Sequence, residues 1–120
     1  MSGARRLARM LKALSVESRV RIVQLLRGRA LCVGALAARL DVTQGAVSQH
    51  LRIMRDAGLV IDEKRGYYVH YRLKRRTLAV WREAIGELLD PTAGPSANTR
   101  GARKCAAAMR RRKAAKSRRT

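Results

Sequence analysis

Polar and cationic side chains recur at helical spacing along residues 42–60 and could hydrogen-bond to a planar partner. On a helical wheel they lie opposite the apolar side chains of Val47, Leu51 and Met54. An amide or guanidinium group can make two parallel hydrogen bonds with one flat edge, and a hydroxyl can bond a phosphate. An ordinary solvated helix face is the alternative interpretation. The residues of this polar face are Gln44, Gly45, Ser48, Gln49, Arg52 and Arg55.

The net charge of +20 favours a polyanionic partner over a merely solvated face. Residues 1–90 contain 18 Lys and Arg against 8 Asp and Glu, a net of +10. Residues 91–120 contain 10 Lys and Arg and no acid, which adds another +10. Because the basic residues are spread along the whole chain, they indicate nucleic acid or an acidic membrane surface rather than one acidic substrate.

Apolar spacing and capping residues predict the helices that hold the polar face. We expect a first helix around residues 7–14, and a second that starts at Ser15 and Ser18 and ends near Gly28. A short third helix stops at Asp41. Thr43 then caps the helix that carries the polar face, and Gly58 ends it.

The third and fourth helices match a helix-turn-helix, in which the second helix enters the major groove of DNA. Asp41 stands at the turn, where its short side chain tolerates a left-handed conformation. Gln can read adenine edges, Arg can read guanine edges, and Ser can bond phosphates or bases. Ala37 is small where the helices cross. We expect the apolar contacts between the two helices from Leu36, Leu40, Val42, Val47 and Leu51.

A β-hairpin is predicted next, from residues 59–64 and 67–73 joined at Arg65-Gly66. Its basic and aromatic turn could reach the neighbouring DNA as a wing, or the hairpin could merely close the core with Tyr68 or Tyr71. The fold class predicted is mainly α with a small β-hairpin, a winged helix-turn-helix. The predicted DNA contacts are Thr43, Gln44, Gly45, Ser48, Gln49, His50, Arg52, Arg65 and Tyr67.

The histidines and cysteines are too few for a tetrahedral zinc site to be well supported, since the chain has two of each. His50 lies at the edge of the apolar face, where we expect a bond to backbone or phosphate. Cys32 near a helix start and Cys105 after Arg103-Lys104 lie in settings that favour thiolate. Alternatively, Cys32 is a small buried hydrophobe and Cys105 an incidental residue.

Domain organisation is predicted to be simple. Residues 1–90 would form the DNA-binding and dimerisation domain, and residues 91–120 a flexible linker and basic tail. Since the chain contains no apolar run of membrane-spanning length, we expect a cytoplasmic protein with no membrane partner. No nucleophile–base–acid constellation, phosphate-cradling glycine loop or paired carboxylates are apparent, so an enzyme is not expected.

Three ordered blocks together resemble the ArsR family of small bacterial winged-helix repressors. They are KALSVESRVRIVQLL, LCVGALAARLDVTQGAVSQHLRIMRDAGLV and RGYYVHYRL, within roughly residues 8 to 90. The resemblance implies a homodimer paired through its first and last helices, which leaves its operator when a metal ion, metalloid or oxidant binds. A wide apolar stripe on the last helix independently favours dimerisation over packing on the first helix alone. The predicted dimer residues are Leu7, Leu11, Leu78, Trp81, Ile85 and Leu88.

The chain differs from the arsenic-responsive members it resembles at the residues that would bind the inducer. Those members typically show Cys-Val-Cys where this chain has Cys32-Val33-Gly34. A trivalent arsenic site wants two or three thiolates, so Cys105 would have to fold back to assist Cys32. We expect no required cofactor and an inducer such as arsenite or antimonite, As(III) or Sb(III). A thiol-redox response and a ligand-independent, nucleoid-type DNA coat are the alternatives.

Overall fold

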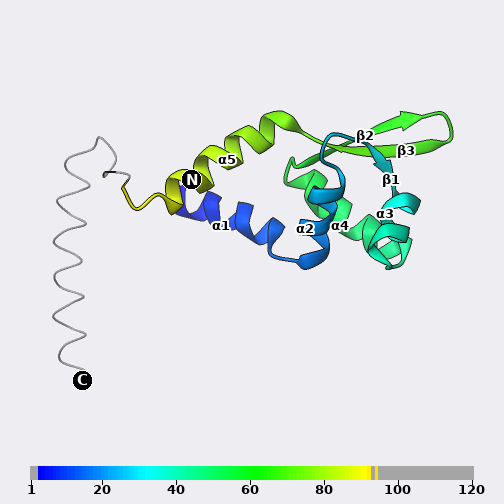
Figure 1. Cartoon of the computed structure of the whole chain (residues 1–120), viewed down its shortest axis with the longest axis horizontal. Helices are drawn as coiled ribbons and strands as arrows, with labels where there is room; N and C mark the ends of the chain where they lie inside the picture. Colours follow the sequence, from blue (N-terminus) through cyan, green and yellow to red (C-terminus); the bar gives the residue numbers. More distant parts are fainter. Residues whose placement is uncertain (1–2, 93, 95–120) are drawn as a thin grey trace, which may run out of the picture. The chain divides into compact units, whose positions relative to one another are not determined.

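The computed structural model describes residues 3–92 and 94 and divides the chain into two compact units, Met1–Leu88 and Leu89–Thr120. The first unit is mainly helical with a small antiparallel sheet, as Figure 1 shows. The predicted fold class is therefore confirmed. The elements in chain order are α1 (Gly3–Leu14), α2 (Glu17–Leu25), β1 (Leu31–Cys32), α3 (Val33–Leu40), α4 (Gln44–Asp56), β2 (Val60–Arg65), β3 (Tyr68–Leu73) and α5 (Arg75–Leu89).

The α3–α4 pair forms the predicted helix-turn-helix. Asp41 adopts the left-handed conformation, with φ 55°, and the Val42 amide donates to the Ala37 carbonyl at 3.2 Å. The Thr43 hydroxyl accepts from the Ala46 amide at 3.1 Å, so the predicted cap is present. Val42 was expected between the helices but lies in the turn after Asp41 and is 38% exposed, so it contributes less to this contact than predicted.

One continuous apolar core positions α3 and α4. It includes side chains from every helix, and its fully buried members leave almost no surface to solvent. Burying a Leu, Ile, Val or Met side chain contributes roughly 1.5–3 kcal/mol each, so this core fixes the orientation of α4. The largest fully buried side chains are Ile22, Leu26, Leu36, Leu51, Met54, Leu59, Val47 and Val60.

The sheet has three strands in the order β1-β3-β2, one strand more than the sequence predicted. The hairpin strands pair from Val60 with Leu73 to Arg65 with Tyr68, and Gly66 takes a positive φ of 63° in the turn. Leu31 and Cys32 add the third strand by pairing with Tyr71 and His70. A two-residue strand is too short to show an alternating pattern, so no local signal in the sequence predicts it.

Helix ends differ from the predictions by a few residues. Ser15 does not cap α2, whose N-cap is Val16; its hydroxyl instead donates to the Lys12 carbonyl at 2.9 Å and so closes α1. The helix α2 ends at Leu25, with Leu26 as its C-cap, two residues before Gly28. The helix α4 ends at Asp56 with Ala57 as its C-cap, so Gly58 directly follows the cap, as predicted. Both glycines adopt positive φ in the turns that follow, since a β-carbon disfavours that conformation.

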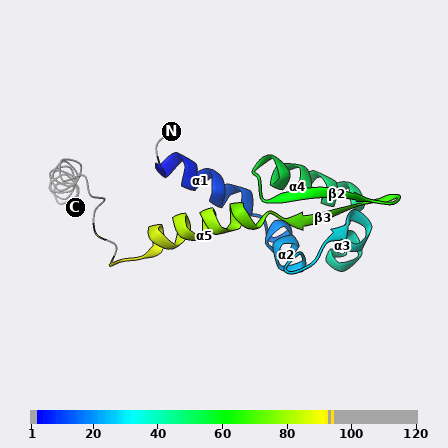
Figure 2. The same cartoon turned by 90° about the horizontal axis from the view of Figure 1, so that it is seen from above.

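The hairpin and the α1–α5 pair lie at opposite ends of the first unit. Figures 1 and 2 both show the hairpin turn extending past the other elements at one end, with α1 and α5 at the other. No helix among residues 3–92 is both long and apolar enough to cross a membrane.

The second unit is described only at its start. The Asp90 carboxylate accepts from the backbone amide and the hydroxyl of Thr92, at 2.9 and 2.7 Å. Cys105 and the rest of the predicted tail lie outside the described residues, and the predicted boundary at residue 90 stays a prediction.

Candidate nucleic-acid interface

The outer side of α4 is polar and open to solvent while its reverse side is sealed in the core. Val47, Leu51 and Met54 are 0%, 1% and 0% exposed. Because the burial pattern follows the helical period, the polar side chains cannot turn inward without exposing the core. The exposed residues of this face are Gln44, Gly45, Ser48, Gln49, Arg52 and Arg55, and the exposed capping residue Thr43 precedes them.

Two members of the predicted polar face are drawn toward neighbouring elements. A β-carbon placed on Gly34 would stand 3.7 Å from Gln44 Nε2, so the Gln44 amide lies against the start of α3. Arg55 is 3.9 Å from the Asp62 carboxylate of β2, with both side chains about half exposed. A pair so open to water is weak and leaves Arg55 able to change partner. Ser48, Gln49 and Arg52 therefore form the most open part of the face.

His50 lies at the edge of α4, where its ring contacts α2. Its Nδ1 accepts a hydrogen bond from Arg19 Nε at 3.2 Å, and Arg19 also donates to the Ala13 carbonyl at 3.3 Å. Partial burial, and then the nearby positive charge of Arg19, lower the pKa of His50 below its usual 6.5. The observed partner of His50 is thus an arginine of α2, and this contact favours the neutral imidazole; a phosphate partner stays a prediction.

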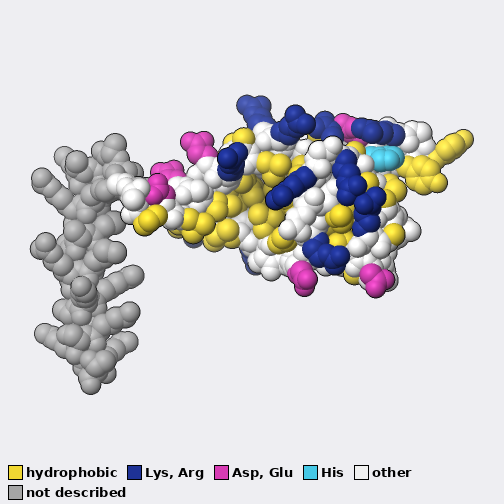
Figure 3. Space-filling view, viewed as in Figure 1, with side chains coloured by type: hydrophobic (Ala, Val, Ile, Leu, Met, Phe, Trp, Pro, Cys, Tyr) yellow, Lys and Arg dark blue, Asp and Glu magenta, His cyan; other side chains and the backbone are white. Residues whose placement is uncertain are grey.

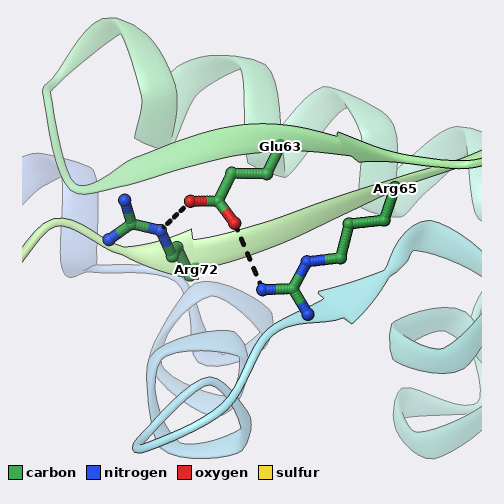
Figure 4. Close-up of polar contacts among 3 residues, drawn as sticks. All are labelled: Glu63, Arg65 and Arg72. Atoms are coloured by element: carbon green, nitrogen blue, oxygen red, sulfur yellow. Dashed lines mark hydrogen bonds and ion pairs between the residues drawn. The ribbon is translucent and has the colours of Figure 1, made fainter.

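The hairpin carries its own ion-pair network near the turn, drawn in Figure 4. The Glu63 carboxylate accepts from Arg72 Nε at 2.5 Å with one oxygen and from Arg65 Nη2 at 3.2 Å with the other. The bonds from Arg72, and then from Arg65, lower the pKa of Glu63 below its usual 4.5. Tyr67 at the tip is fully exposed, and Tyr68 is mostly exposed, whereas Tyr71 packs against the core.

Comparison with known proteins places this arrangement in a family. Residues 17–62, which contain α2, α3 and α4, match the family model "Bacterial regulatory protein, arsR family". The chain is 37% identical over 79 residues to the transcriptional activator HlyU of Vibrio cholerae, with 66% of this chain and 73% of HlyU covered. The chain belongs to the arsR family of bacterial regulatory proteins.

Two further relatives are similar to this chain over different shares of their length. The arsenical resistance operon repressor of Escherichia coli strain K12 is 45% identical over 65 residues, 53% of this chain. The chain spans just over half, 56%, of that repressor's length. The crystal structure of a possible transcriptional regulator for arsenical resistance is 35% identical, with a TM-score of 0.63, and covers 69% of this chain and 86% of that one.

Cys32 occupies the junction of β1 and α3 in this arsR-family chain. It is half-buried, and its cross-strand partner in β3 is His70. Side chains of directly paired residues lie on the same face of a sheet, with Cβ atoms about 4.5–5.5 Å apart. His70 Nδ1 is buried and has no hydrogen-bond partner within the described residues. The sequence analysis missed this neighbour because the β1–β3 pairing was not predicted.

Metal-binding side chains do not converge elsewhere in the described part of this arsR-family chain. Across residues 3–92 and 94, no group of three or more His, Cys, Asp or Glu side chains could hold a metal ion. Cys105, the other predicted sensor residue, lies outside that part. Among the described residues, Cys32 beside His70 is therefore the position where a thiol could react.

The predicted dimer residues form an apolar surface on α1 and α5. Figure 3 shows hydrophobic side chains gathered where Figure 1 places these helices. Leu11 is 42% and Leu88 51% exposed, and Leu7, Leu78 and Ile85 are half-buried against the core. Trp81 differs, because it is only 8% exposed and packs mainly within its own chain.

Proposed function

We propose that this arsR-family chain is a homodimeric, sequence-specific DNA-binding repressor of transcription that reads its operator with α4. The observation that carries the proposal is the open polar face on a helix whose reverse side is fully buried. Arginine and glutamine on such a face can make bidentate bonds to guanine and adenine edges in the major groove. The net charge of +20 supplies the salt-sensitive attraction to phosphates.

Base reading is tested by measuring binding to the DNA upstream of the chain's own gene and to random DNA of equal length. Gln49→Ala and Arg52→Ala should each cost about 1–3 kcal/mol on the operator and far less on random DNA. Gln24→Ala is the matched control for Gln49, since Gln24 is an exposed glutamine on α2. Equal losses on both DNAs would contradict base reading by α4.

Dimerisation through α1 and α5 would place two copies of α4 to read adjacent half-sites. The half-exposed leucines of these helices support this interface, because large exposed apolar patches usually meet a partner. Leu11→Glu should yield monomers in sedimentation experiments. Val20→Glu, on α2 at a similarly exposed apolar position, should leave the dimer intact. A wild-type chain that sediments as a monomer at micromolar concentration would refute the dimer.

Release from the operator is proposed to follow modification or metalloid binding at Cys32. Gly34 stands where arsenic-responsive members that the chain resembles have a second cysteine, so Cys32 supplies one thiolate here. Arsenite or antimonite would need Cys105 as a further thiol, whereas oxidation of Cys32 would not. The neighbouring His70, with Nδ1 unpartnered in the described structure, could exchange a proton with the thiol.

The sensor proposal predicts distinct outcomes for the two cysteines. Cys32→Ser should abolish the inducer response in a gel-shift series with arsenite, antimonite, zinc and peroxide. Cys105→Ser should remove the metalloid response and retain the peroxide response. His70→Phe should slow alkylation of Cys32 by iodoacetamide. Dissociation that persists unchanged in Cys32→Ser would show that the sensor lies elsewhere.

A nucleoid-type role is the second candidate because residues 91–120 add ten cations and no acid. Such a protein would coat DNA without sequence preference or inducer response. Deleting residues 91–120 should reduce the salt dependence of binding in either case, but only the repressor would keep its preference for the operator. Footprints without sequence preference in the full chain would favour the nucleoid-type role.

A further inference from the structure

A cavity of about 450 Å³ lies between α1, the start of α5 and the end of α4. Its floor is apolar, formed by Met10 and Trp81, which are 5% and 8% exposed. Cationic side chains from two elements line it as well, among them Arg6, Lys74 and Arg76. None of the described residues that line it is acidic. The cavity thus combines an aromatic floor with a positively charged wall.

Three of the four cations that line this cavity have no opposite charge beside them within the described residues. Neither α1 nor α5 has an acidic residue in its first turn, although the positive end of a helix dipole favours acids there. Within residues 3–92 and 94, the side chains of Arg6, Lys74 and Arg76 have no carboxylate partner. Residues 91–120 contain no Asp or Glu that could supply one. An external anion would relieve this repulsion.

A second basic cavity has an internal carboxylate partner for two of its five arginines. That cavity, of about 400 Å³, is lined by Arg27, Arg65 and Arg72 among others. There Glu63 binds both Arg65 and Arg72. The other three arginines of that lining, Arg27, Arg29 and Arg75, have no carboxylate partner among the described residues, and the lining contains no aromatic side chain. The two cavities therefore share unpaired cations, and Trp81 distinguishes the α1–α5 cavity.

We propose that the α1–α5 cavity binds a small organic carboxylate with a flat aromatic body. The carboxylate would lie against Arg6, Lys74 and Arg76, and the ring against Trp81 and Met10. A second copy of the chain is a poor occupant, since its own α1 would bring further cations. The cavity also lies on a different side of α1 from the dimer residue Leu11, because Arg6 and Met10 share a face about a third of a turn away.

The chain reports occupancy through its own fluorescence, because Trp81 is its single tryptophan. Sodium benzoate is titrated into the full-length protein at constant ionic strength, with benzyl alcohol and inorganic phosphate as parallel probes. We expect a saturable change in Trp81 emission with benzoate at concentrations below about 10 mM, and much weaker effects with the other two. Phosphate binding as tightly as benzoate would overturn the aromatic carboxylate as ligand.

Variants locate the site. Lys74→Gln and Arg76→Gln should each weaken benzoate binding about tenfold, as expected for losing a charge-assisted bond. Arg82→Gln, on α5 but outside the cavity, should not change it. Val80→Glu places an acid in the cavity wall at a position that is 43% exposed, and should abolish binding without unfolding the chain. Unaltered binding in Val80→Glu, or no saturable signal in the wild type, would overturn the proposal.

Discussion

The helix α4 and the hairpin both expose polar side chains, but their charged groups are partnered differently. On α4, Ser48, Gln49 and Arg52 face solvent with a sealed core beneath them. In the hairpin, Arg65 and Arg72 are bound to Glu63. A rigid face with open hydrogen-bonding groups suits the reading of base edges, whereas guanidinium groups held by an exchangeable carboxylate suit adjustable contact with phosphate. If the proposed DNA contacts are right, we expect that specificity and general affinity for DNA can be altered separately.

The largest expected effect comes from the support beneath α4. Leu51→Ala removes a side chain that is 1% exposed and should lower the free energy of unfolding by about 2–5 kcal/mol, since the core can only partly fill the space. Ile53→Ala, on the same helix at 42% exposure, should change it by about 0.5 kcal/mol or less. Urea unfolding measures both. Similar losses for the two variants would mean that α4 is not anchored as described.

An intermediate effect is expected when the hairpin arginines are released. Glu63→Gln removes the carboxylate that binds Arg65 and Arg72, so both become available to phosphates. Binding to random DNA should strengthen, and the slope of log affinity against log salt should steepen by about one to two.

Glu83→Gln controls for the change in net charge, because Glu83 is an exposed acid on α5, away from the hairpin. In Glu63→Gln the preference for the operator should fall, because we expect the released arginines to add affinity mainly for random DNA. If both variants steepen the salt slope equally, the hairpin network has no special role.

Local signals in the sequence were sufficient for the parts of the fold that depend on near neighbours. The Thr43 cap, the left-handed Asp41 and the hairpin turn at Gly66 each follow from residue type at a short spacing. The buried side of α4 likewise follows from helical periodicity. These features account for the correct prediction of the winged helix-turn-helix.

Contacts between distant segments could not be predicted in the same way. Arg19 and His50 are 31 residues apart, and β1 pairs with β3 through two residues only. Nothing in the local pattern of either segment specifies its partner, because such contacts depend on how the helices pack. The neighbours of Cys32 were missed for the same reason. The pairs of Glu63 with Arg65 and Arg72 are only two and nine residues apart, so the predicted hairpin could have indicated them.

The smallest expected effect concerns the contact between α4 and α2, where His50 accepts a hydrogen bond from Arg19. Because the folded pKa of His50 is lowered, the unfolded chain binds its proton more readily. The stability contribution is therefore fully present above the unfolded pKa of 6.5 and is lost as the pH falls through the lower folded pKa. His50→Gln should flatten this part of the stability–pH profile measured by urea unfolding. Gln49→Ala, on the same helix at a side chain that does not titrate, should not flatten it, and a profile identical to wild type in His50→Gln would show that the Arg19 contact does not couple α4 to pH.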